Sequence, residues 1–132
     1  MKYDLSVLSQ DGIDVQGLLF DTMLQSYVLD ATALRHDMDT LASKHLNYST
    51  TKFEEVAGKG SSQLTFNQIP LEKAAPYAAE DADISLRLFL ALDCQVRAED
   101  SLLKLYTDIE MPLVGVLSRM ERRGALIDGN LL

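Results

Sequence analysis

The spacing of apolar residues along the chain predicts a protein built mainly of helices. Leu24, Tyr27 and Val28, for example, recur at the three- and four-residue intervals that place side chains on one helical face. The longest such pattern begins near Pro70 and continues through most of the second half of the chain. With the capping and stop residues around them, the patterns predict helices over about 5–10, 21–29, 37–46, 51–58, 70–97, 101–106 and 111–123.

Two segments are predicted to be strands. Residues 13–20 are rich in large apolar and β-branched side chains, and a shorter strand is expected over 125–128. An isolated strand cannot satisfy its own backbone hydrogen-bonding groups. We therefore expect residues 13–20 to pair with strands from another chain or from a segment upstream of Met1, and both ends of the chain to be cut points. Within the long helix, Pro76 predicts a kink or a fresh start.

Composition narrows the class of protein. The chain has 132 residues, of which 47% are hydrophobic and 24% charged, which fits one small globular domain or a piece of a larger one. Its 12 Lys and Arg against 20 Asp and Glu give a net charge of −8, which argues against nucleic-acid binding by bulk positive charge. A nucleic-acid enzyme whose carboxylates hold metal ions remains possible.

The same composition predicts a cytoplasmic location. The single cysteine, Cys94, cannot form an internal disulfide and is expected to be a buried, small apolar residue. No apolar run approaches the roughly 18 residues of a membrane helix, so no membrane partner is expected.

The candidate chemistry centres on the helix predicted after residue 70. Tyr77 and Asp81 are four residues apart and share a face, which Ile84 extends towards the expected core. A carboxylate on a buried face needs a cation, a set of hydrogen bonds or a proton. Glu80 and Asp83 add negative charge and favour a metal ion. The alternative is that Asp81 caps a helix or pairs with a surface arginine.

These residues carry a resemblance to a known family. The segment 77–81 resembles the third motif, Tyr-x-x-x-Asp, of the DEDD-type 3′–5′ exonucleases, and Tyr3-Asp4 resembles the end of their second motif. Further segments are similar to the bacterial DNA polymerase I family, and together they cover essentially the whole chain. They are residues 20–24, 35–39, 53–60, 64–69, 109–114 and 117–121.

The resemblance implies an α/β fold, the ribonuclease H-like 3′–5′ exonuclease fold. This chain would be its C-terminal portion, predominantly helical because the first strands are missing. Residues 1–97 would form a partial 3′–5′ exonuclease domain, and residues 98–132 the helical junction that begins the polymerase domain. The parent protein would synthesise DNA in replication and repair, and would proofread by removing mispaired nucleotides from 3′ ends.

The resemblance also assigns a site. Asp81 and Asp4 would ligate two divalent ions, Mg²⁺ or Mn²⁺, and Tyr77 would orient the attacking water. We therefore expect the carboxyl groups of Asp4 and Asp81 to lie close together. The family's first motif, Asp-x-Glu, lies on an early strand, and we expect this chain to lack it. The chain alone is accordingly predicted to have little or no exonuclease activity.

The expected partner is DNA, either a single-stranded 3′ end or a primer–template. Tyr3, Arg35 and Phe53 are candidate nucleic-acid-binding residues, since a guanidinium can contact phosphate and an aromatic ring can stack on a base. A surface arginine and a core phenylalanine are equally good interpretations of Arg35 and Phe53. The piece is also expected to self-associate through an exposed apolar sheet edge and exposed helix faces.

Two other functions compete with the proofreading hypothesis. An RNase D-like 3′–5′ RNA exonuclease could share Tyr77 and Asp81, although residues 109–128 resemble the polymerase junction and count against it. A non-catalytic helical scaffold, such as a polymerase relative whose nuclease has decayed, is the third hypothesis. The two histidines, His36 and His45, have no Cys or His partners at zinc-binding spacing.

Overall fold

The computed structural model describes residues 2–17, 20–126 and 128. Within these ranges the chain is predominantly helical, as predicted. The α-helices are α1 (Lys2–Gln10), α2 (Thr22–Leu29), α3 (Met38–Leu41), α4 (Phe53–Ala57), α5 (Leu71–Arg97), α6 (Asp100–Leu105) and α7 (Met111–Arg123). Shorter turns are the π turns η1 (Ala42–Leu46) and η4 (Tyr106–Glu110) and the 3-10 turns η2 (Gly60–Ser62) and η3 (Phe66–Gln68).

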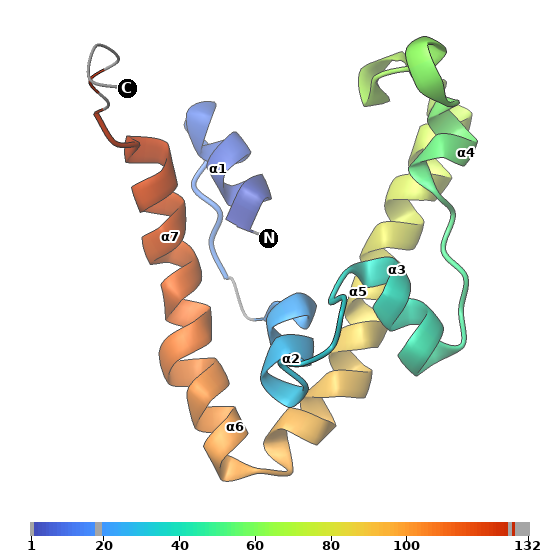
Figure 1. The fold of residues 1–132 in the computed structure, drawn as a ribbon. Coiled ribbons are helices and arrows are strands. Elements are labelled where there is room, and N and C mark those ends of the chain that lie inside the picture. The colour runs from blue at the N-terminus through green and yellow to red at the C-terminus, as the bar shows by residue number, and fades with distance from the viewer. Residues whose placement is uncertain (1, 18–19, 127, 129–132) are drawn as a thin grey trace.

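Two long helical arms form the frame of the molecule (Figure 1). One arm is α5, and the other is the unbroken run of α6, η4 and α7, which begins after the short turn at residues 98–99. Helix α2 packs in the angle between the arms, and α3 with η1 packs on α5. Helix α1 lies along α7, on the far arm from α3 and α4.

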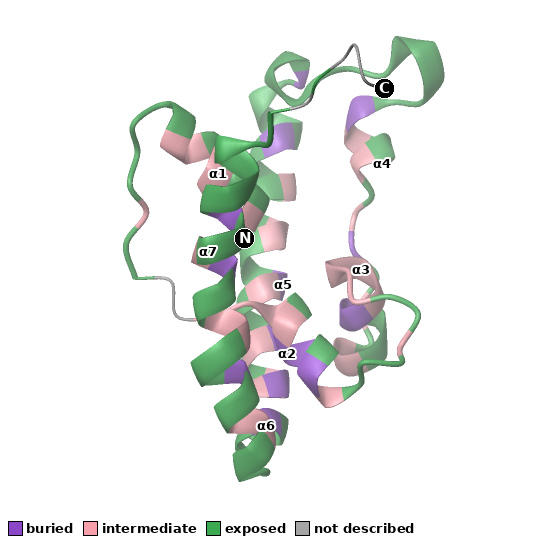
Figure 2. Ribbon diagram, turned by 60° about the vertical axis from the view of Figure 1, so that its left-hand side comes forward, coloured by how far each residue is buried: buried purple, intermediate pink, exposed green. Residues whose placement is uncertain are grey.

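The core lies on one side of α5 and follows the predicted four-residue spacing. Ile84, Leu88, Leu92 and Val96 are fully buried. The first three pack with residues of α3 and η1, and Val96 packs with Val28 and Tyr106. In Figure 2, buried positions appear on α2, α3, α5 and α7. Cys94, which the sequence analysis expected to be buried, is exposed.

Local capping explains why several helices begin where they do. The Asp21 carboxylate accepts hydrogen bonds from the backbone amides of Met23 at 2.9 Å and Leu24 at 3.1 Å, so it satisfies donors that the first turn of α2 leaves free. Asp37 does the same for α3 by accepting from the Thr40 amide at 3.0 Å. Both helix starts agree with the sequence analysis.

The predicted strands are wrong for every residue that the structure describes. Residues 13–17 and 20 are not in a strand, and neither are 125, 126 and 128, while residues 18, 19 and 127 lie outside the described residues. A strand forms only where an extended segment pairs with a second one. The described parts of the chain contain no strand with which these residues could pair. The α/β character expected of the fold is therefore not seen here.

Of the two expectations at Pro76, the fresh start is wrong, because α5 does not restart there. It continues from Leu71 to Arg97 with Pro76 in its second turn. Proline removes the amide that would donate to the carbonyl of Glu72. Glu72 is exposed, so water can take the place of that donor.

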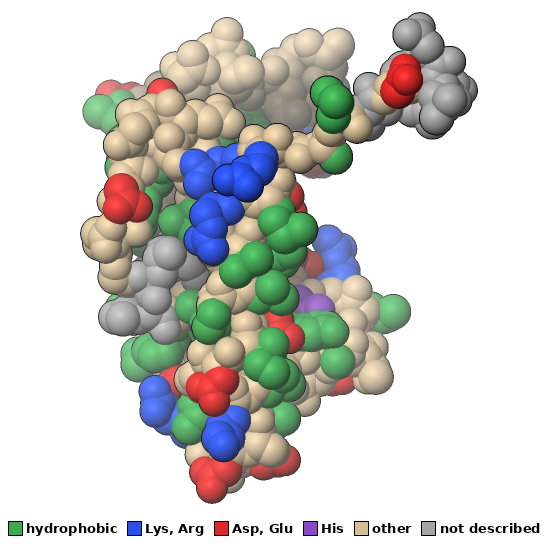
Figure 3. Space-filling model, turned by 90° about the vertical axis from the view of Figure 1, so that its left-hand side faces the viewer, with side chains coloured by type: hydrophobic (Ala, Val, Ile, Leu, Met, Phe, Trp, Pro, Cys, Tyr) green, Lys and Arg blue, Asp and Glu red, His purple; other side chains and the backbone are tan. Residues whose placement is uncertain are grey.

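Hydrophobic side chains gather on the outward face of α7 and η4 (Figure 3). Ile109, Leu113, Val116 and Met120 are exposed and lie at alternating four- and three-residue intervals. In the described part of the chain, no helix has the length and apolar character that a bilayer crossing demands.

Candidate functional site

An aromatic cluster surrounds Tyr77, in the second turn of α5. The ring of Phe53, the first residue of α4, meets the Tyr77 ring edge-on with 6.1 Å between centroids. Phe66, in η3, approaches the same ring at 6.2 Å. Phe53 also packs against the small buried cluster around Ala57. Phe53 is thus half-buried, and its ring contributes both to this small core and to the aromatic cluster around Tyr77.

Asp81 lies one helical turn beyond Tyr77, as the spacing predicted. Partial burial raises the pKa of the Asp81 carboxyl above its ordinary value, and the negative charges of Glu80 and Asp39 raise it further. Burial also raises the pKa of Tyr77, with a contribution from the Asp81 charge. The Tyr77 hydroxyl therefore keeps its proton at neutral pH and can donate a hydrogen bond.

Asp39, in the first turn of α3, belongs to this neighbourhood, and the sequence analysis did not single it out. Its carboxylate accepts hydrogen bonds from the Thr50 hydroxyl and the Lys52 ammonium, both at 2.6 Å. These two bonds hold the pKa of Asp39 below its ordinary value. Asp39 thus holds the Lys52 ammonium near Asp81, because the charge of Asp39 also acts on the Asp81 carboxyl group.

An open pocket of about 510 Å³ adjoins Asp39. Its charged lining consists of Arg35, Lys44 and Lys52 on one hand and Asp37 and Asp39 on the other. The Arg35 side chain is 72% exposed, and its Nε lies 2.9 Å from the Asp37 carboxylate. Exposed cations of this kind can exchange a surface carboxylate for a phosphate at low cost, because surface ion pairs are weak.

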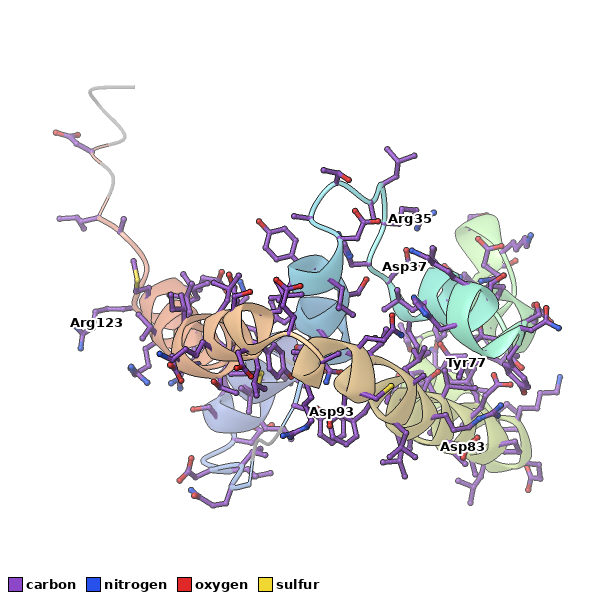
Figure 4. All side chains as sticks on the ribbon, turned by 90° about the horizontal axis from the view of Figure 1, so that it is seen from below. Arg35, Asp37, Tyr77, Asp83, Asp93 and Arg123 are labelled. Atoms are coloured by element: carbon purple, nitrogen blue, oxygen red, sulfur yellow. The ribbon has the colours of Figure 1, made fainter. Side chains whose placement is uncertain are left out.

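The predicted site residues divide into two groups. Figure 4 shows Tyr77 on the side of the molecule that carries α3, together with Arg35 and Asp37, and Arg123 of α7 at the opposite end. Asp81, Tyr77, Phe53 and Arg35 therefore belong to one region of the structure. Tyr3 and Asp4 belong to the other, because they lie on α1.

Helix α1 is held against α7. The Lys2 ammonium lies 2.5 Å from the Glu121 carboxylate, and the hydroxyls of Ser6 and Ser118 are 3.0 Å apart. Tyr3 is 77% exposed and borders an apolar pocket between α1, α2 and α7. The charges that act on Asp81 come from Glu80 and Asp39. Helix α1, which carries Asp4, packs on α7, whereas Asp81 lies on α5, the other arm. This packing gives no support to the expectation that the two carboxyl groups lie together.

The carboxylates around Asp81 do not fit a two-metal centre by themselves. Among the described residues, no group of three or more His, Cys, Asp or Glu side chains is arranged to hold a metal ion. Glu80 and Asp39 are occupied by hydrogen bonds from Tyr48, Thr51, Thr50 and Lys52. Of these three carboxylates, Asp81 is the one that accepts no hydrogen bond from the residues that the structure describes.

The expectation that the chain lacks Asp-x-Glu is wrong as a statement about sequence. Asp108-Ile109-Glu110 has this spacing. The structure places the triplet in η4, a π turn on the opposite arm from Asp81, and not on a strand. It does not supply the carboxylates that the family's first motif would bring to Asp81.

Comparisons with known proteins agree with the resemblance drawn from the sequence. Residues 1–97 match the family model described as 3′–5′ exonuclease. The chain is 59% identical over 133 aligned residues to DNA polymerase I of Pseudomonas aeruginosa, 42% identical over 132 to that of Rhizobium leguminosarum and 41% identical over 133 to that of Chloroflexus aurantiacus.

These alignments cover 99–100% of the chain but only 15%, 13% and 14% of the three polymerases. The chain thus spans about one seventh of the length of the relatives that it matches. The family match covers most of the chain, and the similarity to DNA polymerase I continues beyond it to the last helix. The chain belongs to the 3′–5′ exonuclease family found in bacterial DNA polymerase I.

Proposed function

We propose that this chain is part of a DNA polymerase I that proofreads its own DNA synthesis in replication and repair. Residues 1–97 belong to its 3′–5′ exonuclease domain, of ribonuclease H-like fold, and residues 98–132 begin its polymerase domain. The observation that carries the proposal is the Tyr77–Asp81 pair on α5, with Asp81 partly buried and its pKa raised. The family match and the polymerase relatives support it.

The proposed roles follow from the chemistry of the two side chains. Asp81 ligates a divalent ion, Mg²⁺ or Mn²⁺, with the remaining ligands supplied from elsewhere in the polymerase, because oxygen ligands suit these ions. Tyr77 donates a hydrogen bond that orients the attacking water. Asp4 is the proposed ligand of a second ion, which requires α1 to lie closer to α5 than it does here. The 132-residue chain alone is expected to be inactive.

The proposed substrate is the single-stranded 3′ end of DNA. Phe53 and Arg35 lie on the Tyr77 side of the molecule, where a ring can stack on a base and a guanidinium can contact a phosphate. Tyr3 joins them in the proposal only if α1 moves with Asp4. A DNA substrate is favoured over RNA because the relatives reported above are DNA polymerases.

The proposal is tested by Asp81→Asn in the intact polymerase. Exonuclease activity on single-stranded DNA with Mg²⁺ should fall by about 100-fold or more, because even groups that only support a metal ligand contribute about 10- to 100-fold. DNA synthesis should continue at its normal rate. The control is Glu72→Gln, which changes an exposed carboxyl group in the first turn of the same helix, α5.

Three results would contradict the proposal. The first is an Asp81→Asn polymerase that degrades DNA like its parent, and the second is an equal loss in the Glu72→Gln control. The third is preferential degradation of single-stranded RNA by the parent polymerase, which would favour an RNA exonuclease. The isolated chain, assayed in parallel, should show no Asp81-dependent nuclease activity.

A further inference from the structure

Glu80 connects α5 to a distant segment of the chain. Its Oε1 accepts a hydrogen bond from the Tyr48 hydroxyl at 2.6 Å, and its Oε2 accepts one from the Thr51 amide at 2.8 Å. Tyr48 precedes Glu80 by 32 residues, and Thr51 precedes it by 29. Because each carboxylate oxygen already has a donor, Glu80 acts as an anchor for residues 48–51.

The tyrosine of this anchor is itself held in place. The Arg87 guanidinium lies over the Tyr48 ring, 5.4 Å from its centroid, and is steadied by Asp83 at 3.5 Å. Tyr48 also packs against the core cluster that contains Ile84 and Leu88. Residue 47, which precedes it, has a left-handed backbone (φ 51°) that ends η1 and turns the chain towards α5.

The anchored segment leads directly to side chains of the candidate site. Thr50 is buried and donates to Asp39, and Lys52 pairs with the same carboxylate. Phe53 follows at once and begins α4, with its ring against Tyr77. The two hydrogen bonds of Glu80 therefore determine where a cation and an aromatic ring lie relative to the Tyr77–Asp81 pair.

We propose that Glu80 is a positioning residue, which acts through Tyr48 and Thr51 to hold Phe53 and Lys52 where they grip the 3′ end of a DNA strand beside Tyr77 and Asp81. This inference rests on the proposed function. Glu80 does not touch the reacting atoms, so it governs binding of the strand and not the chemical step. Its removal raises KM for single-stranded DNA and leaves kcat nearly unchanged.

The most selective test is Tyr48→Phe in the intact polymerase. This substitution removes one hydroxyl and keeps the ring that packs on the core and under Arg87. We expect KM for a single-stranded oligonucleotide to rise about tenfold, which is the effect of losing one hydrogen bond to a charged group. We expect kcat to stay within about twofold and DNA synthesis to be unchanged, since a single hydrogen bond to a group outside the chemistry contributes to binding alone.

Two substitutions of Glu80 test whether the rise in KM follows the number of hydrogen bonds that are lost. Glu80→Ala removes both acceptors and should raise KM more than Tyr48→Phe does. Glu80→Gln keeps an acceptor for Tyr48 and should restore part of the affinity. Amide hydrogen exchange at Thr51, measured on the 132-residue chain, should become faster in the order Gln then Ala. Glu72→Gln, on an exposed residue of α5, is the matched control and should change neither quantity.

The outcomes separate this inference from the function on which it rests. If the parent polymerase has exonuclease activity and Tyr48→Phe and Glu80→Ala leave KM unchanged, the positioning role is wrong, even where both variants lower thermal stability. A fall in kcat at constant KM also contradicts it, because it would place Glu80 in the chemistry. If the parent has no Asp81-dependent exonuclease activity, the proposed function fails, and the positioning role fails with it.

Discussion

The backbone amide of Asp21 donates a hydrogen bond to the hydroxyl of Tyr106 at 2.8 Å, across 85 residues of chain. Asp21 is the residue that caps α2, and Tyr106 begins the π turn η4. Tyr106 is only 4% exposed and packs against Val28 and Val96. One buried hydroxyl therefore joins the start of α2 to the arm that carries α7.

The first prediction concerns this hydroxyl. Tyr106→Phe should lower the free energy of unfolding by about 1 kcal/mol, because a partly buried amide loses its acceptor while the ring still packs in the core. Urea unfolding monitored by circular dichroism measures the change. Tyr27→Phe, which alters an exposed ring on α2, is the control and should change stability little. Equal stability of the Tyr106→Phe and parent proteins would show that water replaces the tyrosine at no cost.

The second prediction concerns His45 and pH. Burial lowers the pKa of His45 below its ordinary value of 6.5, with a smaller contribution from the neighbouring Lys44 charge. The unfolded chain therefore takes up a proton at a higher pH than the folded chain. Stability should fall as the pH drops below about 6.5 towards the lowered pKa of the folded state, and His45 should add no pH dependence above 6.5.

Urea titrations at pH 7.5 and 5.5 check this pH effect. The His45→Gln variant should lose part of the difference in unfolding free energy between the two pH values. His36→Gln, which removes the other histidine of the chain, is the control and should keep the His45 contribution. An unchanged difference in His45→Gln would contradict the assignment.

The third prediction addresses Asp4. The Ser6 and Ser118 hydroxyls are 3.0 Å apart, so cysteines at both positions, in a Cys94→Ser background, should form a disulfide on mild oxidation of the 132-residue chain. In the intact polymerase this cross-link should abolish exonuclease activity. It would hold α1, which carries Asp4, against α7 and prevent Asp4 from approaching Asp81. Reduction should restore the activity. Full activity of the cross-linked polymerase would exclude Asp4 from the site of Asp81.

The fourth prediction concerns self-association. The sequence analysis expected it through a sheet edge and exposed helix faces, and the structure offers the apolar face of α7 and η4. Ile109, Leu113, Val116 and Met120 have the alternating spacing by which helices pair along a seam, and Met120 is 62% exposed. Light scattering of the 132-residue chain at micromolar concentration should therefore detect dimers or larger species.

Substitution of that face should reverse the association. A Leu113→Glu, Val116→Glu double variant should scatter as a monomer, because charges at the centre of the seam would be buried without partners. Leu34→Glu places the same charge at a fully exposed leucine of a loop and should leave the association unchanged. A monomeric parent chain would contradict the prediction.

The helices were predictable because their signals are local. Helix α7 begins at Met111 and ends at Arg123, which are the bounds that the sequence analysis predicted. The buried stripe Ile84, Leu88 and Leu92 follows from helical periodicity alone. In each case the information lies within one or two turns of the residue concerned.

The remaining features depend on contacts between distant residues. A strand at residues 13–20 requires a neighbour that the sequence pattern does not identify. The contacts of Asp39 with Lys52 and of Glu80 with Tyr48 join residues 13 and 32 positions apart, so no periodicity indicates them. The packing of α1 on α7 likewise joins distant residues, such as Ser6 and Ser118, which are 112 positions apart.

The π turn η4 determines the direction in which the side chains of α7 point around the helix axis. A π turn holds one residue more than an α-helical turn, and each residue of an α-helix advances the side chains by about 100° around the axis. This added residue lets Tyr106 point towards α2 while Ser118 points towards α1 on the same continuous rod. A one-residue deletion within Tyr106–Glu110 would therefore rotate α7 by about 100°, which is more than a quarter of a turn. The face of α7 that contacts α1 would then point away from α1, although its own residues would be unchanged.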